Sequence, residues 1–80
     1  MTNTLQKVGE LIHDLFDEYQ GPVTRQLTAR SVPQWDSLGH VQLMALVEQI
    51  YGFRFRADQI GKFRDVGDLV DEIERKTAAT

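Results

Sequence analysis

Apolar residues recur at three- and four-residue steps in three stretches of the chain, which is the spacing that places side chains on one face of an α-helix. In the first stretch the apolar face would be formed by Leu5, Val8, Ile12, Leu15 and Tyr19. Asn3 and Gln6 stand three positions apart at its start, a spacing that resembles a capping box. Gly21-Pro22 predicts the end of this helix, because proline cannot continue it.

A second helix is predicted to begin near Ser37 and to end at Gly52. Asp36 precedes it and is a good N-cap, because a carboxylate accepts hydrogen bonds from the unpaired N–H groups of a first helical turn. Glycine is common just after a last turn, since it adopts the left-handed conformation without strain. The inward face is expected to be formed by Leu43, Leu46, Val47 and Ile50, widened by Met44 and Tyr51.

The last third of the chain predicts one short and one longer helix. Phe53 and Phe55 alternate with arginines, but no second strand is available to pair with them, so we expect an extended loop with both rings turned inward. Residues 58–60 would form at most a short helical turn. A final helix would begin after Asp65 as its N-cap. Its apolar face would consist of Val66, Leu69, Val70 and Ile73. Residues 77–80 are expected to fray.

A long loop separates the first two helices. Pro22 and Pro33 forbid a continuous helix across residues 20–35, and loops of this length in a compact domain are usually functional or disordered. Apolar residues favour an ordered loop, held to the core by Val23, Leu27 and Val32. The whole pattern predicts an all-α fold in a single domain over residues 1–80. It is a four-helix bundle of three main helices and one short helix, with a long first loop.

Composition narrows the functions that such a bundle performs. The chain has 80 residues, which is enough for one domain but little for a deep, water-excluding catalytic pocket. It contains no cysteine for a disulfide or a thiolate metal site, which suits a cytoplasmic protein. A net charge of −3 disfavours nucleic acid as a partner, since phosphate binding needs a basic surface. The apolar stretches are too short to span a bilayer, so we expect no membrane partner.

Candidate chemistry is concentrated at Trp35-Asp36-Ser37-Leu38, where the long loop meets the second helix. This position puts the Ser37 hydroxyl on the first residue of a helix, where it is exposed and approachable. The unpaired N–H groups and the positive end of the helix dipole stabilise an anion there by about 0.3–1 kcal/mol. A phosphodiester on Ser37 would therefore lie where the backbone favours it. Trp35 is interpreted as an anchor for the loop.

With these residues in place, the chain resembles acyl and peptidyl carrier proteins, whose second helix opens with an Asp-Ser-Leu motif. The resemblance covers almost the whole chain. Beyond the motif it rests on the apolar residues Val41, Leu43, Leu46, Val47, Tyr51, Phe55, Ile60, Phe63 and Val66. It implies that a separate phosphopantetheinyl transferase uses coenzyme A and a divalent metal to attach a 4′-phosphopantetheine arm to Ser37. The arm would carry acyl or aminoacyl groups as thioesters, and the carrier itself would catalyse nothing.

The resemblance also implies further partners, namely an enzyme that loads the acyl or aminoacyl group and downstream biosynthetic enzymes, all acting on a monomer. Helical spacing predicts a partner-facing side of the second helix made of Leu38, Val41, Gln42, Ala45 and Glu48. Carriers of housekeeping fatty acid synthesis are strongly acidic on this helix, whereas Glu48 is its one carboxylate here. We therefore expect a specialised pathway, making a polyketide, a nonribosomal peptide or an unusual acyl product.

Two non-catalytic alternatives fit parts of the sequence. One is a small nucleic-acid-binding domain, whose basic cluster would be Arg54, Arg56, Lys62 and Arg64. Such domains usually carry a basic recognition helix, and the candidate helices here are neutral or acidic. The other is a protein–protein adaptor whose serine is never modified.

A serine hydrolase is the catalytic alternative, with His40 and Asp36 beside Ser37. A triad needs a base oriented by a third group and an oxyanion hole, and one helical turn does not readily supply both. His40 is therefore interpreted as a surface residue near the arm, and His13 as a solvated residue of the first helix. Two isolated histidines without cysteine do not form a metal site, so none is expected.

Overall fold

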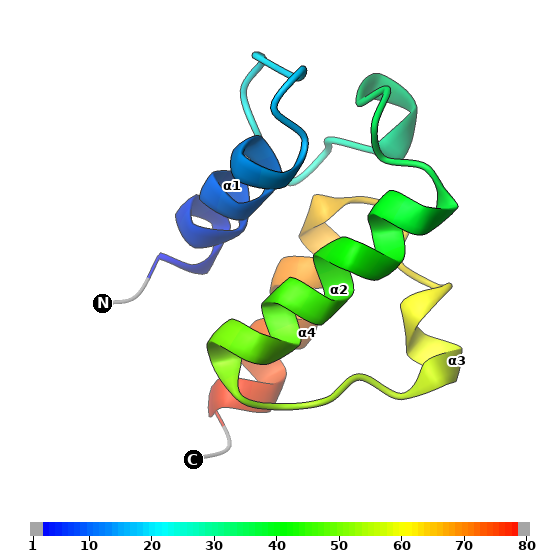
Figure 1. Ribbon diagram of the computed structural model, residues 1–80. Coiled ribbons are helices and arrows are strands. Elements are labelled where there is room, and N and C mark those ends of the chain that lie inside the picture. The colour runs from blue at the N-terminus through cyan, green and yellow to red at the C-terminus, as the bar shows by residue number, and fades with distance from the viewer. Residues whose placement is uncertain (1–2, 79–80) are drawn as a thin grey trace.

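The computed structural model describes residues 3–78, and its regular elements are all helical (Figure 1). They are α1 (Thr4–Leu15), a short 3₁₀ turn η1 (Ala29–Ser31), α2 (Ser37–Tyr51), α3 (Ala57–Ile60) and α4 (Val66–Ala78). Residues 3–78 contain no strand, so the predicted all-α bundle with a long first loop is confirmed. Within this range no helix has both the length and the apolar character needed to cross a membrane. The outermost residues of the predicted domain, 1–2 and 79–80, lie outside the described part.

Polar side chains cap the N-termini of the helices where the sequence predicts. Asn3 Oδ1 accepts a hydrogen bond from the Gln6 N–H at 3.0 Å. At the start of α4, Asp65 Oδ1 accepts one from the Asp68 N–H at 2.9 Å. Each bond satisfies an N–H group that a helix start leaves without an intrahelical partner. Gly52 lies in the left-handed region with φ 76°, which confirms the predicted end of α2.

Helix α1 ends earlier than predicted. The expected end was Gly21-Pro22, but the helix stops at Leu15. Phe16 leaves helical geometry with φ −109° and ψ 70°, although its N–H still makes a helical hydrogen bond. This turn buries the Phe16 ring, which is 1% exposed and stacks on Trp35 with the ring centroids 5.7 Å apart. Burial of the ring in the core outweighs continuation of the helical pattern.

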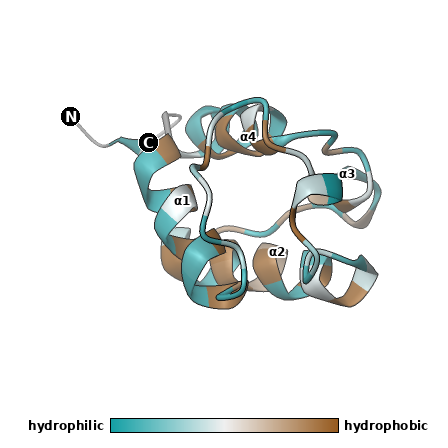
Figure 2. Ribbon diagram, turned by 90° about the horizontal axis from the view of Figure 1, so that it is seen from above, coloured by the Kyte–Doolittle hydropathy of each residue, from teal (hydrophilic) through white to brown (hydrophobic). Residues whose placement is uncertain are grey.

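One apolar core fills the space enclosed by the helices, with α1 packed against both α2 and α4 (Figure 2). Its fully buried side chains are Val8, Ile12, Phe16, Val32, Leu43, Met44, Val47, Val66, Leu69 and Ile73. The long loop is ordered as predicted, because Leu27 and Val32 are buried and Val23 packs against the same core. Phe55 is buried and Phe53 half-buried, so the expectation of inward rings in the loop after α2 is also confirmed.

Two residues depart from the predicted pattern near helix ends. Ile50, expected to face inward, is 45% exposed. It stands at the edge of the apolar stripe, where the turn of about 100° per residue carries its side chain away from the core. Thr77, expected to fray, continues α4, and its hydroxyl donates to the Ile73 carbonyl at 2.8 Å. The last residues of that predicted tail, 79–80, are not among those described.

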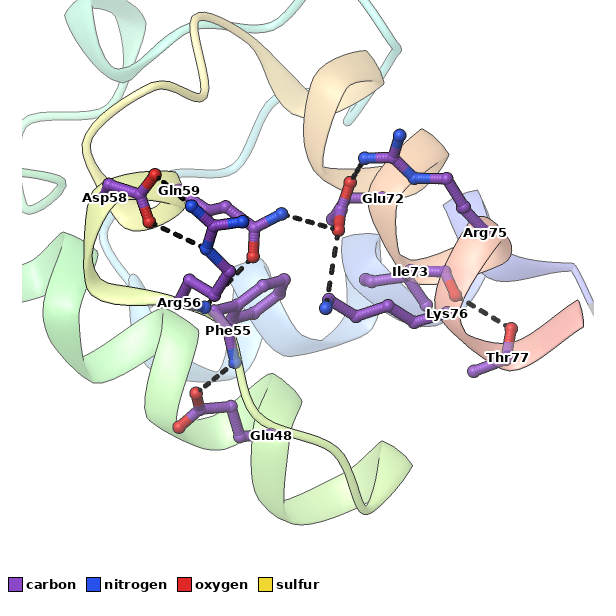
Figure 3. Close-up of polar contacts among 10 residues, drawn as sticks. All are labelled: Glu48, Phe55, Arg56, Asp58, Gln59, Glu72, Ile73, Arg75, Lys76 and Thr77. Carbon is purple, nitrogen blue, oxygen red and sulfur yellow. Dashed lines mark hydrogen bonds and ion pairs between the residues drawn. The ribbon is translucent and has the colours of Figure 1, made fainter. Parts of the chain in front are cut away.

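A buried carboxylate holds α3 to α4 (Figure 3). The Glu72 side chain is buried, and its Oε2 accepts a hydrogen bond from Gln59 Nε2 of α3 at 3.0 Å. Arg75 pairs with the other carboxylate oxygen, and Lys76 Nζ lies 3.6 Å from Oε2. Removing the partners of a buried carboxylate destabilises the fold, because the buried charge is then left uncompensated. The short helix α3, which would be marginal alone, is therefore fixed in position by α4.

Replacing Ile73 with alanine should lower the free energy of unfolding by about 2–5 kcal/mol, because the side chain is fully buried and a cavity would remain. Ile50→Ala removes the same atoms from an exposed position and should cost clearly less. Leu46, half-buried against the core, should fall between them. Denaturant melts of the three variants measure this order, and equal losses for Ile73→Ala and Ile50→Ala would contradict the assigned core.

Candidate functional site

The Ser37 hydroxyl stands exposed on the first residue of α2. Directly before it, Asp36 has extended backbone geometry, with φ −94° and ψ −167°, and its Oδ1 accepts a hydrogen bond from the Gly39 N–H at 2.8 Å. The Asp36 carbonyl accepts the His40 N–H, also at 2.8 Å. The predicted N-cap is therefore confirmed. Among residues 3–78 the Ser37 hydroxyl makes no hydrogen bond, so its oxygen is available for reaction at the positive end of the helix.

Gly39 allows the long loop to lie directly on the first turn of α2. A Cβ atom at this position would meet the Gln34 carbonyl oxygen at 2.4 Å and the Phe16 ring at 2.9 Å. Contacts this short to backbone cannot be relieved by a side-chain rotation, so only glycine fits without a shift of the loop. The sequence gives no signal for this requirement, because the two touching residues come from other segments.

Trp35 and His40 form a hydrogen-bonded pair beneath Ser37. Trp35 is 8% exposed, which confirms the predicted loop anchor. Its Nε1–H donates to His40 Nδ1 at 3.0 Å. Since an indole N–H can only donate, Nδ1 must be the unprotonated nitrogen of His40. The proton then lies on Nε2, which donates to the Ile60 carbonyl at the end of α3, 2.6 Å away.

This pairing corrects the prediction that His40 is a surface residue. The ring is half-buried, and both of its nitrogens are engaged away from Ser37. Neither nitrogen is left to accept the serine proton, which is the role that a triad base performs. His40 therefore cannot act as the general base that a serine hydrolase would need in this arrangement. His13 is exposed, with Nε2 2.7 Å from the Gly21 carbonyl oxygen.

The exposed face of α2 is apolar and neutral. Leu38 is 67% exposed and Val41 55% exposed, and Gln42 and Ala45 are exposed beside them. Glu48 differs from its predicted place on this face. It is half-buried, and its Oε2 accepts a hydrogen bond from the Phe55 N–H at 2.7 Å (Figure 3). The only carboxylate of the helix thus supports the loop after α2, because that extended loop lacks a backbone partner for this N–H.

The basic cluster predicted after α2 is partly neutralised. Arg56 donates two hydrogen bonds to the Asp58 carboxylate, and this lowers the pKa of Asp58. The Arg64 backbone N–H donates to Asp68 Oδ2 at 3.0 Å, which lowers the pKa of Asp68, and the Arg64 guanidinium lies 3.4 Å from the same oxygen. Residues 3–78 hold no group of three or more histidine, aspartate and glutamate side chains placed to bind a metal ion.

No protein-family model and no curated protein matches the chain. Among solved structures, it is similar to the solution NMR structure of the holo acyl carrier protein from Geobacter metallireducens. The two share 31% sequence identity, with a TM-score of 0.87. The match covers 98% of this chain and 90% of that one, so the likeness extends from the first helix to the last.

Asp36→Ala should lower the free energy of unfolding by about 0.5–2 kcal/mol, because it removes the acceptor for the Gly39 N–H. Ser37→Ala should leave the stability nearly unchanged, since the serine hydroxyl makes no hydrogen bond within residues 3–78. Urea or guanidinium melts of the two variants compare neighbouring positions of the same helix start. A larger loss for Ser37→Ala would mean that the cap is assigned one position too early.

Proposed function

The chain belongs to the acyl carrier protein family, and we propose that the Ser37 hydroxyl is the attachment point of a 4′-phosphopantetheine arm. The single observation that carries this proposal is the exposed, unbonded serine on the first residue of α2, directly after its Asp36 cap. The Geobacter metallireducens protein, described as a holo acyl carrier protein, supports it by its likeness over almost the whole chain.

The proposed attachment is a phosphoryl transfer catalysed by a separate phosphopantetheinyl transferase. Ser37 Oγ attacks the phosphorus that bears the pantetheine portion of coenzyme A. The new Oγ–P bond forms as the pyrophosphate P–O bond breaks, adenosine 3′,5′-bisphosphate leaves, and the serine proton passes to a base of the transferase. A divalent metal on the transferase is expected to stabilise the charge on the pyrophosphate.

This chain contributes position and a favourable field to that reaction rather than a catalytic group. Asp36 holds the first turn of α2, and Ser37 lies exposed on the first residue of that turn. The N-terminal N–H groups and the helix dipole favour the phosphodiester by about 0.3–1 kcal/mol. Once attached, the arm would supply a terminal thiol that holds an acyl or aminoacyl group as a thioester. The carrier is then a substrate of other enzymes and not an enzyme itself.

We further propose that the loading and downstream enzymes recognise Leu38, Val41, Gln42 and Ala45 on α2. These side chains lie exposed on the helix that Ser37 begins, and Leu38 and Val41 are its large exposed apolar residues nearest to Ser37 in the sequence. The neutral face supports a specialised pathway, such as that of a polyketide, a nonribosomal peptide or an unusual acyl group. The cytoplasmic location, the monomeric state and the lack of a nucleic-acid partner stay predictions.

Incubation of the purified protein with coenzyme A and a broad-specificity phosphopantetheinyl transferase should add the mass of one phosphopantetheine. Ser37→Ala should add none, although its fold is expected to persist. Intact-mass spectrometry with peptide mapping makes the measurement. Ser31→Ala is the matched control, because Ser31 is an exposed serine of η1 outside the motif. Modification at another residue, or none with a transferase active on a reference carrier, would refute the proposal.

Leu38→Ala and Val41→Asp should slow transfer of the cargo to a downstream enzyme more than Gln42→Glu does, because binding would rest on apolar burial at about 25 cal/mol per Å². Rates should change little between low and physiological salt, since added salt weakens only interactions between charges and these four side chains carry none. Stopped-flow or quenched-flow transfer assays measure both effects. Abolition of transfer by modest salt, with the fold intact, would show that the partner instead recognises charge.

A further inference from the structure

A shallow groove beside Ser37 and a small cavity have part of their wall in common. Trp35, His40 and Phe63 line both, and the buried side chains of Met44 and Leu69 line only the cavity. The cavity reaches Leu69 of α4 and has a volume of about 40 Å³. Pockets that enclose small organic ligands typically measure about 300–1,000 Å³. The interior next to Ser37 therefore has room for a water molecule rather than for an alkyl chain.

Hydrogen bonds and ring stacking both hold this wall in place. The Trp35 and His40 rings stack with centroids 6.2 Å apart and planes within 17° of each other. His40 accepts from Trp35 and donates to Ile60, so it ties the long loop, α2 and the end of α3 together. Moving His40 aside would leave the Trp35 N–H and the Ile60 carbonyl without these partners in a partly buried place, which is unfavourable.

We infer that His40 closes the core to whatever Ser37 carries, so that this cargo stays at the surface of the bundle. The inference rests on the proposed function only for the existence of a cargo. An alkyl chain held outside the bundle keeps its apolar surface in water, and the unfavourable free energy of that exposure grows with the exposed area. The class of cargo that suits a closed bundle is therefore a short or polar acyl group, such as an aminoacyl or small hydroxyacyl group.

A chemical tether tests the inference without the transferase. The chain has no cysteine, so Ser37→Cys carries its only thiol, and its single tryptophan gives one indole N–H resonance. The variant is alkylated in parallel with N-ethyl- and N-dodecyl-iodoacetamide, in which the S–C bond forms, iodide leaves and the thiol proton passes to the buffer. We expect the same indole resonance and the same melting temperature for both adducts.

A displaced Trp35 indole resonance together with a higher melting temperature in the dodecyl adduct would overturn the inference, because a group that binds inside the folded state stabilises it. Adding His40→Ala to Ser37→Cys should open the wall. The dodecyl adduct should then melt above the ethyl adduct, and the indole resonances of the two adducts should differ from each other. Gln49→Ala, an exposed change on the same helix, is the matched control and should leave the two adducts alike.

A folded His40→Ala variant whose two adducts behave identically would show that His40 does not close the core. If His40→Ala fails to fold, as judged by circular dichroism, the smaller polar substitution His40→Asn takes its place with the same two expected outcomes. Because the arm is not used, these results are independent of the intact-mass test of Ser37. A failure here therefore leaves the proposed carrier function standing. A failure of the intact-mass test would remove the cargo but would leave the closure of the core by His40 measurable.

Discussion

The close approach of the long loop to the first turn of α2 is the constraint on which the rest of the site depends. With no side chain at Gly39, the Gln34 carbonyl and the Phe16 ring come within a distance that a Cβ atom would block. The Gln34 side chain also accepts a hydrogen bond from the Glu18 N–H at 2.9 Å, so the loop is tied to the segment after α1. This contact positions Asp36 at the start of α2. The next residue, Ser37, lies outside the packed structure.

At the start of α2, different neighbouring residues stabilise the fold and carry the reactive hydroxyl. Asp36 caps the helix and Gly39 receives the loop, whereas Ser37 takes part in neither contact. A carrier needs this separation, because its modified residue must present the arm to the pocket of another enzyme while the fold stays intact. In a domain of this size the total stability is about 4–12 kcal/mol, so a modified residue that also held the fold would put much of it at risk. An exposed serine after a separate cap avoids that conflict.

Local signals were predictable from the sequence, and contacts between distant segments were not. The caps at Asp36 and Asp65 act within three residues, so the spacing of polar and apolar residues was enough to place them. The early end of α1 depends on Phe16 reaching Trp35, nineteen positions later, with no local signal. His40 reaches the Ile60 carbonyl across twenty positions, and Glu48 reaches the backbone of the next loop. In both cases a polar side chain that helical spacing alone assigns to the surface is drawn inward by a backbone group that lacks a partner.

The distribution of charge follows from these same contacts. Glu48 is turned toward the Phe55 N–H, so the one carboxylate within α2 leaves its open face. Several other charged side chains hold α3 and the start of α4, through the Arg56–Asp58 and Arg64–Asp68 pairs and the buried Glu72 of α4. Such pairs satisfy one another and present little net field, whereas the exposed apolar area around Leu38 has nothing to cover it within the described residues. Covering this area would be favourable for a protein that docks here, since burial of apolar surface needs no matching charge on the partner.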